Sequence, residues 1–365
     1  MKRKSVALLF ISIIALLLII AGCSSGKEET STPANNNDDN QEAAAEETFN
    51  FKVATATPEA DQDSQLIYKG FMDKVTELTD GRVQFEWYPA QQLGSFGDYI
   101  TMTSNGAVDI AMFAVSVFPN EMPLGNAVTG IPGIYEKAQE GAIAYHNLTR
   151  QSPMLETDFL RHGVVPLVAI TTPQYNVFTK KIPVKTPDDL KGVKLRASGG
   201  LHSEMVEFIG GIPVAIPSAD MYEAYEKGAV DGLHGFASSD VLGGYREISN
   251  YATRNLHFSG GTTGLMMNEE LYNSLPDDIK EAMKEAGDYV AANGSEAYEQ
   301  DVIEREDRWI NDKEVEFYEP NESEREQWQK YYDEFTEYFL EKKNNEDLNK
   351  VIEMFRAEVE KVRNN

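Results

Sequence analysis

The sequence predicts an α/β protein made of two similar lobes. Strand-like and helix-like segments alternate from residue 49 onwards, the order expected of sheets whose strands are connected by helices. Roughly 315 residues follow that point, more than a single hydrophobic core usually organises. The tetrapeptide Gly-Ala-Val-Asp occurs at 106–109 and again at 228–231, each time after a short helical segment that contains a tyrosine. This internal echo favours two related lobes.

The first lobe begins with a β-α-β-α-β pattern. Apolar or alternating runs predict strands at 49–56, 83–88 and 108–117, and apolar residues at helical spacing predict helices at 64–78 and 98–104. This order implies a mostly parallel sheet flanked by helices. The pattern then repeats. We expect further strands at 164–170, 174–178, 193–197, 212–216 and 230–233, with helices at 202–209 and 220–227.

Two long helical tracts end the chain. Asp277 and Asp278 fit the first turn of a helix that continues to about residue 313, and a second tract covers 322–363. The aromatic stripe of the second tract is typical of core packing rather than of a ligand site. We expect lobe I to comprise 49–172 and about 262–300, and lobe II about 173–261 and 301–340, with about 322–365 packing across both lobes.

The N-terminus has the pattern of a secretory signal. Lys2, Arg3 and Lys4 precede an apolar run over 6–20, and Ala21-Gly22 stands before the single cysteine, Cys23. Residues 1–22 resemble a bacterial lipoprotein signal peptide, which implies lipid on Cys23 and an extracytoplasmic, membrane-anchored protein. The alternative is a transmembrane anchor, but the apolar run of ~15 residues is short for a span of about 20. The polar segment 23–48 predicts a flexible tether.

The charge of the chain limits its partners. The formal net charge is −27, and removal of three positive charges with the signal leaves −30 (−27 − 3). Nucleic acid and anionic lipid surfaces are poor partners for such a chain. An acidic ligand would need a locally basic site.

The sequence offers no reactive constellation. The histidines are scattered and form no HExxH or similar metal-binding pattern, and neither a GxSxG elbow nor a Walker loop is present. We therefore expect a protein that is not an enzyme, with no catalytic residues, no cofactor and no metal. A secreted hydrolase is the less favoured alternative.

Arg196 is the strongest candidate for ligand binding. It ends the strand-like VKLR run, at the sheet edge where α/β proteins bind ligands. Its planar guanidinium matches a carboxylate with two parallel hydrogen bonds. The competing interpretation is a surface ion pair, which contributes little to stability.

The segments around Arg196 resemble the solute-binding proteins of tripartite ATP-independent periplasmic (TRAP) transporters, the DctP family. The resemblance spans about residues 50–340. It implies a two-lobed fold like that of type II periplasmic binding proteins, joined by a hinge and a long helix. It also implies that Arg196 binds the carboxylate of an organic acid and that the protein, expected to be a monomer, delivers it to membrane permease subunits. The matching segments are QLGSFGDYITMTSNGAVDIAM (92–112), TPDDLKGVKLRAS (186–198), GGIPVAIPSADMYEAYEKGAVDG (210–232) and NEELYNSLPDDIKEAMKEA (268–286).

The chain departs from members of the family that bind sialic acid. A second arginine expected before Arg196 is replaced by Gln174-Tyr175-Asn176, and Gly235-Phe236 stands where those members have an asparagine. We therefore expect a keto acid, a dicarboxylate or a sugar acid. An ABC-type binding protein and a sensory ligand-presenting lipoprotein remain alternatives. The expected ligand contacts are Arg196, Gln174, Tyr175, Ser198, Phe236, Ser238, Thr57 and Ser116.

Overall fold

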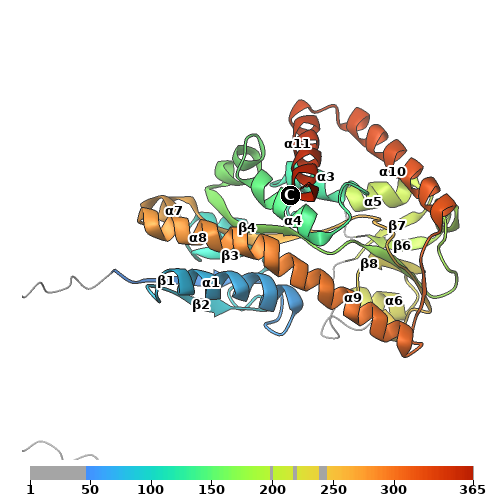
Figure 1. The fold of residues 1–365 in the computed structure, drawn as a ribbon, viewed down its shortest axis with the longest axis horizontal. Helices are drawn as coiled ribbons and strands as arrows, with labels where there is room; N and C mark the ends of the chain where they lie inside the picture. The colour runs from blue at the N-terminus through green and yellow to red at the C-terminus, as the bar shows by residue number, and fades with distance from the viewer. Residues whose placement is uncertain (1–46, 198–199, 217–219, 238–244, 365) are drawn as a thin grey trace, which may run out of the picture. The chain divides into compact units, whose positions relative to one another are not determined.

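A computed structural model describes residues 47–197, 200–216, 220–237 and 245–364 of the protein. Residues 46–365 form one compact unit. Its interior is built on two β-sheets covered by helices (Figure 1). This is the two-lobed α/β architecture that the sequence predicts, whereas the exact boundaries of the lobes stay a prediction.

The first sheet has five strands in the order β2-β1-β3-β10-β4. β1 pairs in parallel with β2 and β3, whereas β10 is antiparallel to both β3 and β4. The sheet is therefore mixed, and β10 comes from a segment in which we predicted no strand. Every residue of β10 is buried, so it lacks the apolar–polar alternation that marks a half-exposed strand. The strands are β1 (Phe49–Ala54), β2 (Val83–Tyr88), β3 (Ile110–Phe113), β4 (Val164–Thr171) and β10 (Thr262–Asn268).

β3 is shorter than the predicted strand over 108–117. The chain leaves the sheet after Phe113, and the backbone N–H of Val117 donates to the carbonyl of Ala114 over 2.9 Å. Ala114 and Val115 of this turn are buried without belonging to the sheet, whereas Val117 is exposed. Apolar character alone therefore overestimated the length of the strand.

The second sheet has six strands in the order β11-β9-β5-β8-β6-β7. β6 lies between β7 and β8 and is parallel to both, whereas β5 is antiparallel to β8 and β9. The sequence did not predict β9 and β11, which have three residues each and are too short to show a period. The strands are β5 (Asn176–Thr179), β6 (Lys194–Ala197), β7 (Ile212–Ala215), β8 (Gly232–Gly235), β9 (Tyr251–Thr253) and β11 (Glu316–Tyr318).

The repeated Gly-Ala-Val-Asp segments have the same structural role in both sheets, because each ends a helix and binds a neighbouring strand. Gly106 and Gly228 end short helices with φ of 75° and 77°, a left-handed conformation that favours glycine. The Asp109 carboxylate then accepts the N–H of Lys52 in β1 at 2.7 Å, and the Asp231 carboxylate accepts the N–H of Lys194 in β6 at 3.2 Å. Each aspartate thus ties the return from a helix to a parallel strand, as predicted for a structural role.

The sequence predicted some of the helices that flank the sheets and missed others. The helices expected over 64–78, 98–104, 202–209 and 220–227 are present, but α3 and α4 were not predicted because most of their residues are buried, which removes the amphipathic period. The helices are η1 (Ser64–Lys69), α1 (Gly70–Leu78), η2 (Phe96–Asp98), α2 (Tyr99–Ser104), α3 (Pro123–Gly130), α4 (Ala138–Thr149), η3 (Leu155–Phe159), η4 (Leu160–His162), η5 (Pro187–Leu190), α5 (Gly200–Phe208), α6 (Met221–Glu226), η8 (Tyr245–Glu247) and α7 (Glu269–Ser274).

A long helix connects the surroundings of the two sheets. It consists of α8 (Asp277–Tyr289), a π-helical turn η9 (Val290–Gly294) and α9 (Ser295–Asn311), close to the predicted 277–313. Figure 1 shows it in orange, running from β3 and β4 towards α6. α8 packs on β4, and Trp309 near the end of α9 packs on Phe178 of β5, with ring centroids 6.4 Å apart. The helix therefore joins the cores of both sheets.

The last tract is divided into α10 (Glu322–Lys343) and α11 (Glu346–Arg363) by the left-handed Asn344, with φ of 44°. The rings of α10 pack on Phe208 of α5, beside the six-stranded sheet. α11 packs on α3 and α4 (Figure 1). Its Phe355 also meets Tyr135, which precedes α4, with ring centroids 6.1 Å apart. The break at Asn344 thus separates a helix that packs on α5 from one that packs on α3 and α4.

The close packing of α8 generates a prediction. A Cβ at Gly287 would come within 2.3 Å of the Leu167 carbonyl oxygen, a backbone atom that cannot easily move. We expect Gly287→Ala to lower the free energy of unfolding by about 1–3 kcal/mol. Gly97→Ala is the control, because nothing lies within 4 Å of its Cβ position. Urea unfolding of both variants tests this, and an equal effect of the two substitutions would contradict the packing described.

Candidate ligand-binding site

The segment before β6 shapes the approach to Arg196. Thr186 and Asp189 form a capping box around η5, in which the Asp189 carboxylate accepts the N–H of Thr186 at 2.8 Å. Gly192 then turns the chain with φ of 74°. The TPDDLKG motif is therefore a short capped turn that aims the chain into the sheet.

Arg196 lies near the end of the central parallel strand β6. Its residue partners are Val214 of β7 and Leu233 of β8, and only 5% of its surface is exposed. Its Nε donates to the Ile216 carbonyl oxygen over 2.9 Å, which fixes the plane of the guanidinium. Burial lowers the pKa of Arg196, but an arginine keeps its charge in proteins. The strand end therefore holds a buried positive charge.

Aromatic rings surround this charge. The Tyr175 ring centroid lies 5.7 Å from that of His202, 5.4 Å from that of His234 and 5.7 Å from that of Phe236. The Tyr175 backbone is held by hydrogen bonds with Ser259 and Phe258. Burial raises the pKa of the Tyr175 hydroxyl, while the charge of Arg196 acts in the opposite direction. Of the predicted contacts, Tyr175 lies within electrostatic range of Arg196, and Phe236 packs on Tyr175.

Two buried histidines belong to this group and were missed in the sequence. The rings of His202 and His234 are 4.9 Å apart, and the Nε2 of His202 pairs with the Gly260 carbonyl oxygen at 3.1 Å. Neither ring nitrogen of His234 has a hydrogen-bond partner among the described residues. Burial lowers the pKa of His202 to about 4 and that of His234 well below its ordinary value. Both rings are therefore neutral near pH 7.

A carboxylate lies on the other side of these rings. Phe236 meets Tyr298 of α9 edge-on at 5.7 Å, and the Tyr298 hydroxyl donates to Oδ1 of Asp63 over 3.0 Å. Burial, together with the nearby Asp61 carboxylate, raises the pKa of Asp63 to about 6. In a chain this acidic, a single aspartate gives no sequence signal, so Asp63 and Tyr298 were not predicted.

The other predicted contacts lie as follows. Gln174 donates to the Tyr135 carbonyl oxygen at 3.0 Å, and Thr57 shares a 2.8 Å hydrogen bond with Ser64. Ser116 is exposed in the turn after β3. Ser198, Ser238 and Cys23 lie outside the described residues. The ligand contacts of the whole set stay predictions.

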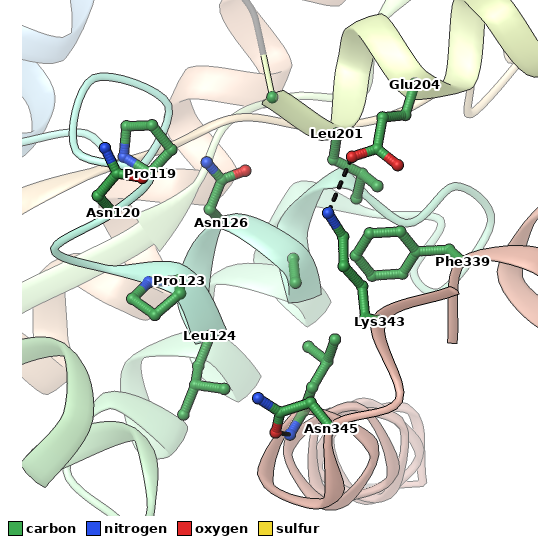
Figure 2. Close-up of a pocket in the computed structure, with 13 residues that line it drawn as sticks. Pro119, Asn120, Pro123, Leu124, Asn126, Leu201, Glu204, Phe339, Lys343 and Asn345 are labelled. Carbon is green, nitrogen blue, oxygen red and sulfur yellow. Dashed lines mark hydrogen bonds and ion pairs between the residues drawn. The ribbon is translucent and has the colours of Figure 1, made fainter. Parts of the chain in front are cut away.

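A separate cavity of about 310 Å³ opens where α3, α5, α10 and α11 meet (Figure 2). Lys343 and Glu204 form an ion pair at its wall, with Nζ and the carboxylate 2.9 Å apart, and Lys342 pairs with the same carboxylate. Burial raises the pKa of Glu204, but the two lysines outweigh it and the net change is a decrease. None of the predicted ligand contacts lines this cavity, which we read as a junction between helices.

The part of the chain that the structure describes contains no cluster of three or more His, Cys, Asp or Glu side chains placed to hold a metal ion. Each of its helices is also too short or too polar to cross a lipid bilayer.

A two-lobed α/β architecture with a buried arginine at a strand end is typical of proteins that bind a solute between their lobes. The model of the bacterial extracellular solute-binding protein family 7, DctP, matches residues 53–343. The chain belongs to this family, which confirms the resemblance to TRAP solute-binding proteins. Members of the family are binding components of transporters, so the comparison also supports a protein that is not an enzyme.

Individual relatives agree with this assignment. A solute-binding protein of Chromohalobacter salexigens is 25% identical over 236 residues, 64% of this chain and 69% of the relative. The C4-dicarboxylate-binding periplasmic protein DctP of Rhodobacter capsulatus is 26% identical over 292 residues, 77% and 82% of the two chains. A TRAP solute-binding protein of Rhodoferax ferrireducens, solved with copurified benzoate, superimposes with a TM-score of 0.75 at 21% identity. That match covers 86% of this chain and 98% of the solved one, and it shows the shared fold.

The buried histidines generate a prediction about pH. His202 takes up its proton near pH 4 in the folded protein and near 6.5 when unfolded, so the unfolded state binds more protons between these values. Stability therefore falls as the pH is lowered from about 6.5 towards 4. His202→Gln should make this fall shallower by up to about 1.4 kcal/mol per pH unit.

Urea unfolding at a series of pH values measures the effect, and His162→Gln, at a half-buried position on η4, is the control. An unchanged slope in His202→Gln would show that this ring does not titrate as described.

Proposed function

We propose that the protein is the extracytoplasmic solute receptor of a TRAP transporter, which captures a small organic acid and delivers it to membrane permease subunits. Membership of family 7 supports the transport role. The ligand class is supported by relatives that bind acids, a C4-dicarboxylate-binding protein and a protein solved with benzoate. Both kinds of ligand share a carboxylate, which is the group that an arginine recognises best.

The observation that carries this proposal is the buried guanidinium of Arg196. Its Nε donates a hydrogen bond to the Ile216 carbonyl oxygen, so the plane of the guanidinium is fixed before a ligand binds. A carboxylate that accepts hydrogen bonds from the terminal nitrogens would form a charge-assisted pair worth roughly 1.5–3 kcal/mol. His202 and His234 stay neutral, so Arg196 supplies the positive charge in this group of residues. We assign the carboxylate to Arg196, with Tyr175 and Phe236 packing against the body of the ligand.

The remaining assignments follow from the same site. Gln174, Ser198 and Ser238 would add polar contacts from the second lobe, and Thr57 and Ser116 would close from the first. A ligand that touches both lobes favours the closed arrangement, because these contacts form together only when the lobes meet. The closed form is then the one that the permease subunits receive.

We also propose that lipid on Cys23 anchors the protein to the membrane. The support is the sequence itself, a basic start, an apolar run and Ala21-Gly22 directly before the single cysteine. The polar segment that follows would let the folded part reach its permease while it remains attached.

The carboxylate assignment predicts the behaviour of Arg196→Gln. The substitution removes the charge and the paired donors, so we expect the ligand's affinity to fall about tenfold or more. A thermal-shift screen of organic acids, followed by titration calorimetry on the best binder, measures this, since a bound ligand raises the melting temperature. Arg356→Gln, on the exposed face of α11, is the control. Unchanged affinity in Arg196→Gln would refute the assignment.

The anchor predicts the location of a Cys23→Ser variant. Without the thiol no lipid can be attached, so we expect the variant to leave the membrane fraction while the wild-type protein stays in it. Cell fractionation followed by detergent partition measures this, with Ser25→Ala as the control. Equal membrane retention of Cys23→Ser and wild type would show that the attachment does not depend on this cysteine.

A further inference from the structure

Asp63 lies at the opposite end of a row of side chains from Arg196. A row of neighbouring groups runs between the two: the Tyr175 hydroxyl lies within electrostatic range of Arg196, Phe236 packs on Tyr175, Tyr298 packs on Phe236, and the Tyr298 hydroxyl donates to the Asp63 carboxylate. The Asp63 charge also acts on the Tyr175 hydroxyl. Asp63 comes from the segment between β1 and η1, whereas Arg196 comes from β6. The two ends of the row thus belong to the two different sheets.

Asp63 lies within the helical turn that leads into η1, with φ of −58° and ψ of −39°, and its side chain makes no capping hydrogen bond there. Its carboxylate accepts a hydrogen bond from Tyr298 of α9, far away in the sequence. The Asp63 side chain is therefore held by a different element of the fold.

Three residues of this row are only partly buried, namely Asp63, Tyr175 and Phe236. Tyr298 and Tyr68 are buried, and Tyr68 shares a hydrogen bond with Thr263. An aspartate and two aromatic residues that each keep some exposed surface thus lie along the row that leads towards Arg196.

We propose that Asp63 is a second polar subsite, which accepts a hydrogen bond from a hydroxyl or ammonium group at the end of the ligand remote from its carboxylate. The proposal rests on the carboxylate assignment to Arg196 and narrows the ligand to acids that carry a donor. Tyr298 is a positioning residue that orients Asp63. An ionised acceptor discriminates strongly, because a ligand without a donor leaves the carboxylate without a replacement for its lost water.

Two matched sets of acids test the subsite. One set is butyrate, 4-hydroxybutyrate and 4-aminobutyrate, and the other is benzoate, 3-hydroxybenzoate and 3-(aminomethyl)benzoate. Within each set the carboxylate is constant and only the donor changes, so the hydroxyl and ammonium arms separate the two kinds of donor. Titration calorimetry at pH 7.5, where an Asp63 with a pKa of about 6 is ionised, gives the affinities.

We expect at least one donor-bearing acid to bind wild type roughly 10- to 100-fold more tightly than its plain partner. Asp63→Asn and Asp63→Ala should remove most of this preference while the plain acid binds as before. Tyr298→Phe keeps the carboxylate but removes the hydrogen bond that orients it, so the preference should shrink without being lost. Asp80→Asn, at an exposed turn, is the control, and melting temperatures confirm that each variant is folded.

The outcomes separate this proposal from the one on which it rests. Equal affinity of wild type for plain and donor-bearing acids, or a preference that survives in Asp63→Asn and Asp63→Ala, would overturn the subsite and leave the carboxylate assignment standing. A Tyr298→Phe variant that behaves as Asp63→Asn does in every measurement would assign the pair a structural role and also overturn the subsite. Wild type that binds none of the six acids would overturn both proposals together.

Discussion

The buried charge of Arg196 is the constraint on which the rest of the site depends. A guanidinium held in the interior is costly unless dipoles or an anion compensate it. The sheet supplies the Ile216 carbonyl, and the histidines beneath are kept neutral by their own burial, so the local field stays suited to one negative group. In a chain of net charge −27, the proposed capture of an acid requires such a locally positive site.

The framework around Arg196 explains how groups from distant segments meet. The repeated Gly-Ala-Val-Asp segments are tied to parallel strands in the two sheets, Asp109 to β1 and Asp231 to β6, the strand that carries Arg196. The long helix α8–α9 then joins both cores and carries Tyr298 between them. On either side of Asn344, α10 packs on α5 and α11 packs on α3 and α4. A ligand held at both ends would therefore draw on both lobes.

Much of this fold could be predicted from the sequence, and the misses have physical causes. Residues 83–88 alternate in polarity or favour strands, and they predicted the observed bounds of β2. All residues of β10 and most of α3 are buried, so neither segment shows the periodic change in polarity that marks a strand or a helix. Arg196 stood out because a charged residue ended an apolar strand. His202, His234, Asp63 and Tyr298 could not be assigned to the site, since they are brought together only by the register of β6 with β8 and by the path of α9. The spacing of residues along the chain does not predict which strands pair with each other in a sheet.

The central claim is that a ligand carboxylate binds the guanidinium of Arg196, and a crystal structure of the full folded part with its ligand tests it most directly. Protein purified with its natural ligand, or soaked with the best acid of a screen, should show both carboxylate oxygens within hydrogen-bond distance of the terminal nitrogens of Arg196. A ligand whose acid group lies elsewhere, with Arg196 bonded to protein atoms alone, would contradict the account.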